Sequence, residues 1–280
     1  MAFLPITHLV FAKTKANNTM KKLSYTNSHY SSPSHNPGAL YKLFPSTCFY
    51  LRFLKEIMVS AHKARQGLYT GEAWVNSSLA ILGMLEKIGV SFDISGIEHL
   101  QKQDGPAVII GNHMSALETA ILPSLVYPKK PVTFVVKQSL LDYPVFKHVV
   151  GARNPIAVSR TNPRSDLKTV MTEGCKRIEE GTSIIVFPQT TRSHSFSATE
   201  MSSIGVKLAK KAGVPIIPLA LRTDAWENGK KLKDFGKINI TKKVYFAFGN
   251  PLTVQDRGTE EQEHICKFIE NKLHEWSLSL

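Results

Sequence analysis

Cysteine is scarce in this chain. Its three cysteines, Cys48, Cys175 and Cys266, lie far apart in 280 residues. An odd number at such distances predicts neither a disulfide framework nor a metal site, and it is typical of a protein in reducing cytosol. Cys175 has apolar neighbours in a stretch of helical pattern. We therefore interpret it as a small core residue and not as a nucleophile.

Long hydrophobic runs are also lacking. No stretch reaches the roughly 18 uncharged apolar residues that a transmembrane helix needs. Residues 1–12 are apolar but short, without an early positive region or a small-residue cleavage site, so we do not interpret them as a signal peptide. The patterns of helix-turn-helix, zinc-finger and RNA-recognition proteins are missing, and so is the Gly-x-Ser-x-Gly elbow of serine hydrolases. These absences disfavour a nucleic-acid-binding protein and a serine hydrolase.

Positive charge is present in excess. The 35 lysines and arginines outnumber the 22 acidic residues, which gives a net charge of +13, and the sequence pI is about 9.6. This balance favours anionic partners such as lipid headgroups, phosphorylated substrates or phosphorylated carriers. The alternative is a basic surface kept for solubility. The length is sufficient for one sizeable hydrophobic core.

Composition divides the chain into three regions. Residues 13–47 are rich in Ser, Asn, Lys and Pro, and we predict that residues 1–48 are mobile or loosely packed. Residues 49–92 contain two stretches, around 50–61 and 74–88, with apolar residues at helical spacing and basic edges. They form either a pair of helices at a membrane interface or a helical hairpin packed on the core. Residues 93–280 form the main domain.

Short strands alternate with helices in this main domain. The alternation predicts an α/β fold with a mostly parallel central sheet flanked by helices. In such sheets the site forms beyond the carboxyl ends of the strands. The predicted strands are 107–111, 132–136, 155–158, 183–187, 215–221 and 243–248, and the predicted helices are 116–126, 139–149, 165–180, 198–212 and 259–276.

Two patterns at predicted strand ends carry chemistry. His113 follows the strand 107–111, and Glu118 comes five residues later, where a helix begins. A carboxylate bonded to one ring nitrogen fixes the tautomer and leaves the other nitrogen to act as a general base. Arg192 lies among hydroxyl residues after the strand 183–187, an arrangement that holds anions. The alternatives are a histidine that caps a helix and a surface arginine.

Four segments resemble, in order and spacing, those of the glycerolipid acyltransferase family, the 1-acylglycerol-3-phosphate acyltransferases and their relatives. The resemblance covers roughly residues 95 to 255 and is closest to a divergent bacterial branch. Glu118 stands where the family has aspartate, and Gln189 and Thr190 replace the Glu-Gly of its Phe-Pro-Glu-Gly-Thr-Arg segment. The four segments are 112–118, 154–160, 187–192 and Val-Pro-Ile-Ile-Pro at 214–218.

The resemblance implies an O-acyltransferase whose catalytic domain is residues 93–280. It would transfer a fatty acyl group from acyl-CoA or acyl carrier protein to a lysophospholipid hydroxyl, with 1-acylglycerol-3-phosphate as the first acceptor and no metal or cofactor. It would work peripherally on the cytoplasmic face of an anionic membrane. The alternatives are another lysolipid or aminolipid acceptor, or a non-catalytic membrane-surface protein on the same fold. The implied roles are general base for His113, orientation of that base for Glu118, and substrate binding for Lys137, Arg160, Gln189, Thr190, Thr191 and Arg192.

Overall fold

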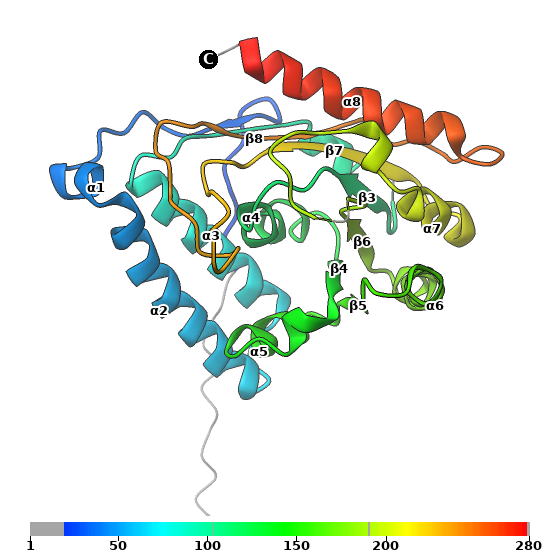
Figure 1. Cartoon of the computed structure of the whole chain (residues 1–280), viewed down its shortest axis with the longest axis horizontal. Helices are drawn as coiled ribbons and strands as arrows, with labels where there is room; N and C mark the ends of the chain where they lie inside the picture. Colours follow the sequence, from blue (N-terminus) through cyan, green and yellow to red (C-terminus); the bar gives the residue numbers. More distant parts are fainter. Residues whose placement is uncertain (1–19, 103, 190, 279–280) are drawn as a thin grey trace, which may run out of the picture.

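The computed structural model describes residues 20–102, 104–189 and 191–278. Eight strands of these residues form one sheet in the order β1-β2-β8-β7-β3-β6-β4-β5 (Figure 1). The pairs β1–β2 and β7–β8 are antiparallel, and the other neighbours are parallel, which confirms the predicted α/β class. The strands are β1 (Tyr30–Ser31), β2 (Phe92–Ser95), β3 (Val108–Gly111), β4 (Val132–Lys137), β5 (Ile156–Val158), β6 (Ser183–Val186), β7 (Ile216–Arg222) and β8 (Val244–Phe248).

The central strands are largely apolar because helices cover both faces of the sheet. Side chains alternate between the faces along a strand, so Ile109 of β3 packs into one core while Val108 and Ile110 pack into the other. The first core lies under α2 (Pro45–Arg65), α3 (Gly71–Lys87), α4 (Leu117–Val126) and α5 (Phe146–Gly151). The second lies under α6 (Pro163–Glu179), α7 (Ile204–Ala212) and α8 (Thr259–Leu278), on the opposite side in Figure 1.

The segment before residue 49 differs from its prediction. Strand β1 extends the sheet edge beside β2, and Tyr30 and Ser32 donate hydrogen bonds from their hydroxyls to Glu86 at 2.6 and 2.5 Å. Helix α1 (Ala39–Leu43) follows, and α2 already begins at Pro45. The partners of this segment lie more than 50 residues away, so its own composition carried no signal of them. Residues 1–19 lie outside the described residues.

Two predicted helices are each interrupted. The helix expected at 139–149 is a 3-10 turn, Gln138–Leu141, followed by α5, with Pro144 and Val145 between them. Proline lacks the N–H that a continuous helix needs, and Val145 has a φ of 69°, which ends helical backbone. The helix expected at 198–212 is likewise a short 3-10 turn, Ala198–Glu200, followed by α7. None of the helices in the described ranges is long and apolar enough to cross a membrane.

Candidate active site

The site lies where four neighbouring parallel strands end. Strands β3, β6, β4 and β5 are adjacent, so the residues that follow them meet at one edge of the sheet. His113 follows β3 by two residues, Phe187 follows β6 directly, Lys137 ends β4, and Arg160 follows β5 by two residues. The order of the strands thus brings together side chains that are far apart in the sequence.

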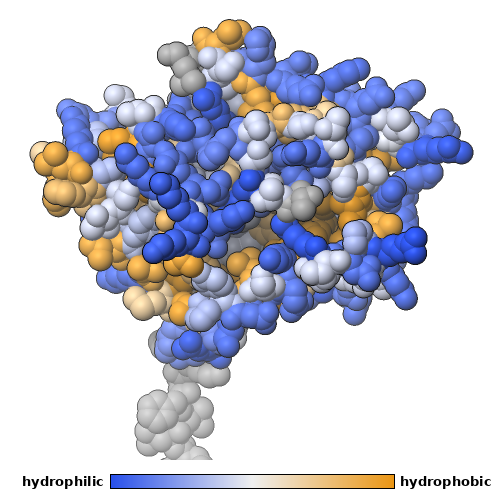
Figure 2. Space-filling model, viewed as in Figure 1, coloured by the Kyte–Doolittle hydropathy of each residue, from blue (hydrophilic) through white to orange (hydrophobic). Residues whose placement is uncertain are grey.

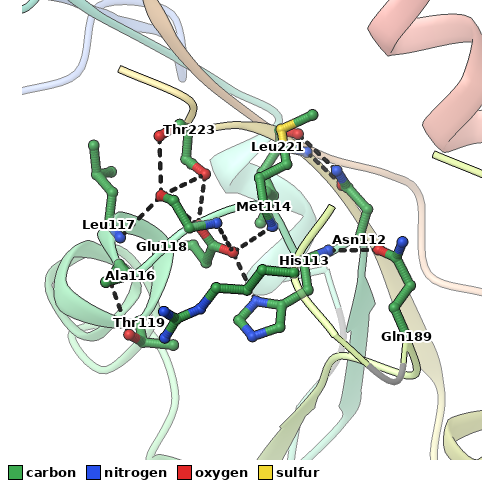
Figure 3. Close-up of polar contacts among 12 residues, drawn as sticks. Asn112, His113, Met114, Ala116, Leu117, Glu118, Thr119, Gln189, Leu221 and Thr223 are labelled. Atoms are coloured by element: carbon green, nitrogen blue, oxygen red, sulfur yellow. Dashed lines mark hydrogen bonds and ion pairs between the residues drawn. The ribbon is translucent and has the colours of Figure 1, made fainter. Parts of the chain in front are cut away.

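His113 and Glu118 form a buried hydrogen-bonded pair. Nδ1 of His113 lies 2.8 Å from Oε1 of Glu118 (Figure 3). Glu118 sits in the first turn of α4, is 0 % exposed, and accepts hydrogen bonds from the backbone N–H groups of Met114 and Ser115 at 2.8 and 3.0 Å. These donors favour the ionised carboxylate. Because an ionised carboxylate only accepts hydrogen bonds, the proton of a neutral His113 lies on Nδ1, and Nε2 keeps its lone pair.

A second group of contacts holds the far oxygen of Glu118. The hydroxyl of Thr223 donates to Oε2 at 2.5 Å, and the hydroxyl of Ser115 lies 3.2 Å from the same oxygen. Burial alone would raise the pKa of Glu118, but the hydrogen bonds from His113, Thr223 and Ser115 outweigh it and hold the pKa below its usual value. Thr223 was missed in the sequence, although it directly follows β7 and so lies at the same sheet edge.

The backbone of His113 is fixed from the neighbouring loop. Its N–H donates to Oε1 of Gln189 at 2.7 Å, and its carbonyl accepts from Ser193 at 2.9 Å. The ring stacks on Phe187, with centroids 4.7 Å apart and planes at 7°. Gln189 was predicted to bind substrate; it is 3 % exposed, and its described contact is with the His113 backbone. It therefore positions the loop that carries the histidine.

Asn112 supports the same loop from the other side. Its amide nitrogen donates to the carbonyl of Leu221 at 2.8 Å, and its amide oxygen accepts from the N–H of Leu221 at 2.9 Å (Figure 3). This two-bond contact ties the end of β3 to β7, the strand that leads into Thr223. By joining the end of β3 to β7, Asn112 fixes the positions of His113 and Thr223, the two partners of Glu118, relative to each other.

The side chain of His113 lines a cavity of about 660 Å³. Its size and mostly apolar wall are typical of a site for a small molecule or a lipid chain. The face of the molecule in Figure 2 is mostly hydrophilic, with hydrophobic surface visible between the polar side chains. The apolar wall comes from α2, α3, α4, β4 and α5 and includes Phe53, Ile57, Trp74, Ile81, Ala116, Ala120, Phe134, Val136, Phe146 and Val149.

The rim of the cavity is charged. Arg160 and Arg192 both line it, and so do the exposed residues Lys137 and Thr191. Burial and the neighbouring positive charge of Arg192 lower the pKa of Arg160. The predicted substrate-binding residues Lys137, Arg160, Thr191 and Arg192 are thus brought together, while Thr190 lies outside the described residues.

Two rim residues were not identified from the sequence. Lys233 and Asp234, on a loop after β7, also line the cavity, and Asp234 forms an ion pair with Arg192.

The backbone of Arg160 adopts a φ of 61°. Hydrogen bonds from the N–H groups of Ser159 and Arg160 to the carboxylate of Asp166, at 2.8 and 2.7 Å, hold this conformation. No cluster of three or more potential metal ligands occurs among the residues that the structure describes.

Comparison with known proteins assigns a family to the middle of the chain. Residues 91–222 match the family described as Acyltransferase. This segment belongs to the acyltransferase family. The matched segment contains His113, Glu118, Arg160 and Arg192, whereas α2 and α3, which contribute to the apolar cavity wall, precede it.

The chain is similar to proteins of bacteria and plants. It is 30% identical over 132 residues to the 1-acyl-sn-glycerol-3-phosphate acyltransferase of Pseudomonas aeruginosa. The matched region covers 47% of this chain and 49% of that protein. The chain is 30% identical over 130 residues to a chloroplastic 1-acyl-sn-glycerol-3-phosphate acyltransferase of Brassica napus, over 46% of this chain and 36% of the relative. The chain thus spans about half or less of the length of these curated relatives.

A solved structure has the same fold. The 1-acyl-sn-glycerophosphate (LPA) acyltransferase PlsC of Thermotoga maritima superposes with a TM-score of 0.63 at 17% identity, over 85% of this chain and 97% of that one. The likeness therefore extends beyond the matched family segment to the helices and strands on either side of it. Because the sequence identity is low, this comparison shows a common fold and nothing about the activity of the chain.

Proposed function

We propose that this protein is an O-acyltransferase that moves a fatty acyl group from an acyl thioester to the hydroxyl of 1-acylglycerol-3-phosphate. The observation that carries the proposal is the His113–Glu118 pair at 2.8 Å on the wall of an apolar cavity with arginines at its rim. A general base, a space for a lipid chain and cations for an anionic headgroup are the three parts that such a reaction requires.

His113 is the base in the proposed reaction. As the acceptor hydroxyl attacks the thioester carbonyl, its proton passes to Nε2 of His113, and Glu118 stabilises the charged ring through Nδ1. The tetrahedral intermediate then collapses, the carbon–sulfur bond breaks, and the proton goes to the departing thiolate. The acyl group ends on the acceptor oxygen, so no covalent enzyme intermediate and no serine or cysteine nucleophile is needed.

The cavity accommodates the apolar parts of the substrates. Its wall residues Phe134 and Trp74 are 7 % and 8 % exposed, so an acyl chain beside them is removed from water. Burial of a methylene group stabilises the complex by about 0.8 kcal/mol. The chain would then place its thioester carbon beside His113, where the cavity wall changes from apolar to charged.

The charged rim binds the anionic parts of the substrates. Arg160, Arg192 and Lys137 carry positive charge where a headgroup phosphate would lie. Acyl-CoA and acyl carrier protein are both negatively charged donors, which suits a chain of net charge +13.

Helix α2 is proposed to rest on an anionic membrane as a peripheral contact at the cytoplasmic face. Its apolar residues Phe49, Phe53 and Ile57 are buried in the core, while Leu51 and Met58, on another side of the helix, are 69 % and 59 % exposed. Basic residues occur on and beside this helix, and hydrophobic surface is visible over α1 and the start of α2 at the left of Figure 2. An amphipathic helix of this type inserts its apolar side between lipid headgroups.

Product analysis tests the proposal. The purified chain is incubated with mixed acyl-CoAs and a panel of lysolipids, and the products are analysed by mass spectrometry. Acyl-CoA is then replaced by acyl carrier protein that carries the same acyl groups as thioesters. We expect phosphatidate from 1-acylglycerol-3-phosphate with at least one donor. Binding to anionic vesicles without acyl transfer to any acceptor would instead support a non-catalytic membrane-surface protein.

A further inference from the structure

The arginine at the cavity rim already holds an anion from its own chain. Nη1 of Arg192 lies 2.6 Å from Oδ1 of Asp234, and the two side chains are 18 % and 33 % exposed. Both residues line the cavity. The carboxylate therefore lies on the arginine that the proposed function assigns to the acceptor headgroup.

This carboxylate comes from a loop and not from the segment that carries Arg192. Asp234 is 42 residues from Arg192 along the chain. Gln189, three residues before Arg192, is uncharged and turns its amide oxygen to the His113 backbone. The negative charge beside Arg192 therefore comes from Asp234, whose side chain is one-third exposed. The backbone of Asp234 is held separately, because its carbonyl accepts a hydrogen bond from the indole N–H of Trp226.

We propose that Asp234 is a specificity-determining residue that occupies the headgroup position on Arg192 and makes the site select phosphomonoester acceptors over phosphodiester acceptors. The inference rests on the proposed function and names the acceptor class for that site. The acceptor phosphate must displace the Asp234 carboxylate from Arg192, and the selectivity follows from the charges that are exchanged.

The exchange compares one anion with another. A carboxylate carries one negative charge, and so does the phosphodiester of a lysolipid with a substituted headgroup, so replacing Asp234 by a phosphodiester gains little. A phosphomonoester carries about 1.5 to 2 negative charges at pH 7 and three acceptor oxygens. It therefore competes for Arg192 and also interacts with the positive charge of Arg160, the neighbour whose pKa is lowered by burial and by the charge of Arg192.

The test is acceptor kinetics of Asp234→Asn. With one acyl-CoA, kcat/KM is measured for 1-acylglycerol-3-phosphate and for lysophosphatidylglycerol. We expect wild type to prefer the phosphomonoester, and we expect the variant to reduce this preference about 10-fold, mainly through a lower KM for the phosphodiester, because asparagine leaves Arg192 uncompensated. Asp142→Asn is the matched control. Asp142 is exposed and does not line the cavity, and its substitution removes the same negative charge.

The outcomes separate this inference from the proposed function. An unchanged preference in Asp234→Asn, or a change equal to that of Asp142→Asn, overturns the inference and leaves the acyltransferase proposal intact. Failure of wild type to transfer acyl groups would overturn the proposed function. Calorimetric titration with glycerol 3-phosphate and glycerophosphoglycerol then tests Asp234 without catalysis: the inference expects Asp234→Asn to bind the diester more tightly, and equal binding in both proteins overturns it.

Discussion

At the scale of single residues, the site depends on how a longer carboxylate is held. Glu118 contacts His113 through one oxygen and Thr223 through the other, and both oxygens are buried. A glutamate has one more rotatable bond than an aspartate, so it needs additional contacts to present its oxygen in a fixed place. Ser115 and Thr223 provide those contacts from α4's entry and from the end of β7.

The variant Thr223→Val tests this support. It removes a hydroxyl donor from a buried carboxylate, so we expect a loss of about 1–3 kcal/mol in the free energy of unfolding at neutral pH. The folded-state pKa of Glu118 lies below its usual value of 4.5, so its contribution to stability is present above that pH and is lost as the pH falls through the folded pKa. The variant raises this pKa, and the acid loss then begins at higher pH.

Urea unfolding of Thr223→Val and Thr223→Ser between pH 3.5 and 7 provides the measurement. The serine variant keeps the hydroxyl, so its pH dependence should follow that of wild type. If the two variants show the same stability curve, the hydroxyl does not hold the carboxylate.

The sequence predicted the pairing of His113 with Glu118 but not the other partners of the site. His113 and Glu118 are five residues apart, so a local pattern contains both. Thr223 is 105 residues from Glu118, and Asp234 is 42 from Arg192. Contacts over such distances depend on the order of the strands and the path of the loops. Neither leaves a local pattern in a single sequence. Knowledge of the strand order would have placed Thr223 near the site, because it follows β7, the neighbour of β3. Nothing in the sequence of the loop identified Asp234.

At the scale of elements, strand prediction succeeded where burial imposes a pattern. The runs at β3 and β6 are apolar on both faces, and their predicted bounds agree with the structure to within one residue. Strand β1 has two residues and depends on pairing with β2, so no periodicity revealed it. The helix expected at 139–149 failed because one proline and one positive φ divide it.

Helix α2 has an exposed apolar side that the core does not explain. The triple variant Leu51→Ser, Leu54→Ser and Met58→Ser removes side chains that are 69 %, 43 % and 59 % exposed. We expect binding to anionic vesicles to fall about 10-fold or more, because each apolar group inserted into lipid contributes on the order of 1 kcal/mol. Vesicle co-sedimentation at fixed salt measures the effect.

Leu278→Ser is the control for this surface. Leu278 is 74 % exposed at the end of α8, a helix that packs on the second core, whereas α2 packs on the first. Its loss should leave vesicle binding unchanged. Equal binding by wild type and the triple variant would remove α2 from the membrane contact.

At the scale of the whole molecule, the cavity unites parts that the family segment does not contain. Residues of α2 and α3 line it together with His113 and other residues at the sheet edge. Chain-length preference should therefore depend on residues before the matched segment 91–222. Ile81 of α3 is such a residue, 4 % exposed and part of the cavity wall.

The variant Ile81→Phe should shorten the preferred acyl chain. A larger side chain in the wall takes space from the cavity, and mismatched chains lose about 1–3 kcal/mol of transition-state binding, or roughly 10-fold or more in relative rate. Competition among acyl-CoAs of different lengths, followed by mass spectrometry, reports the shift. Ile81→Leu conserves volume and should keep the wild-type profile; a profile that is the same in both variants would show that the chain lies elsewhere.

The central claim is that His113 takes the proton from the acceptor hydroxyl. The most direct measurement compares acyl transfer by wild type, His113→Ala and His194→Ala, each with its circular dichroism and thermal unfolding recorded. His194 is an exposed histidine in the nearby loop that does not line the cavity. We expect a folded His113→Ala to lose about 100-fold or more of the rate, while His194→Ala keeps it. Near-wild-type transfer by a folded His113→Ala would show that His113 is not the base.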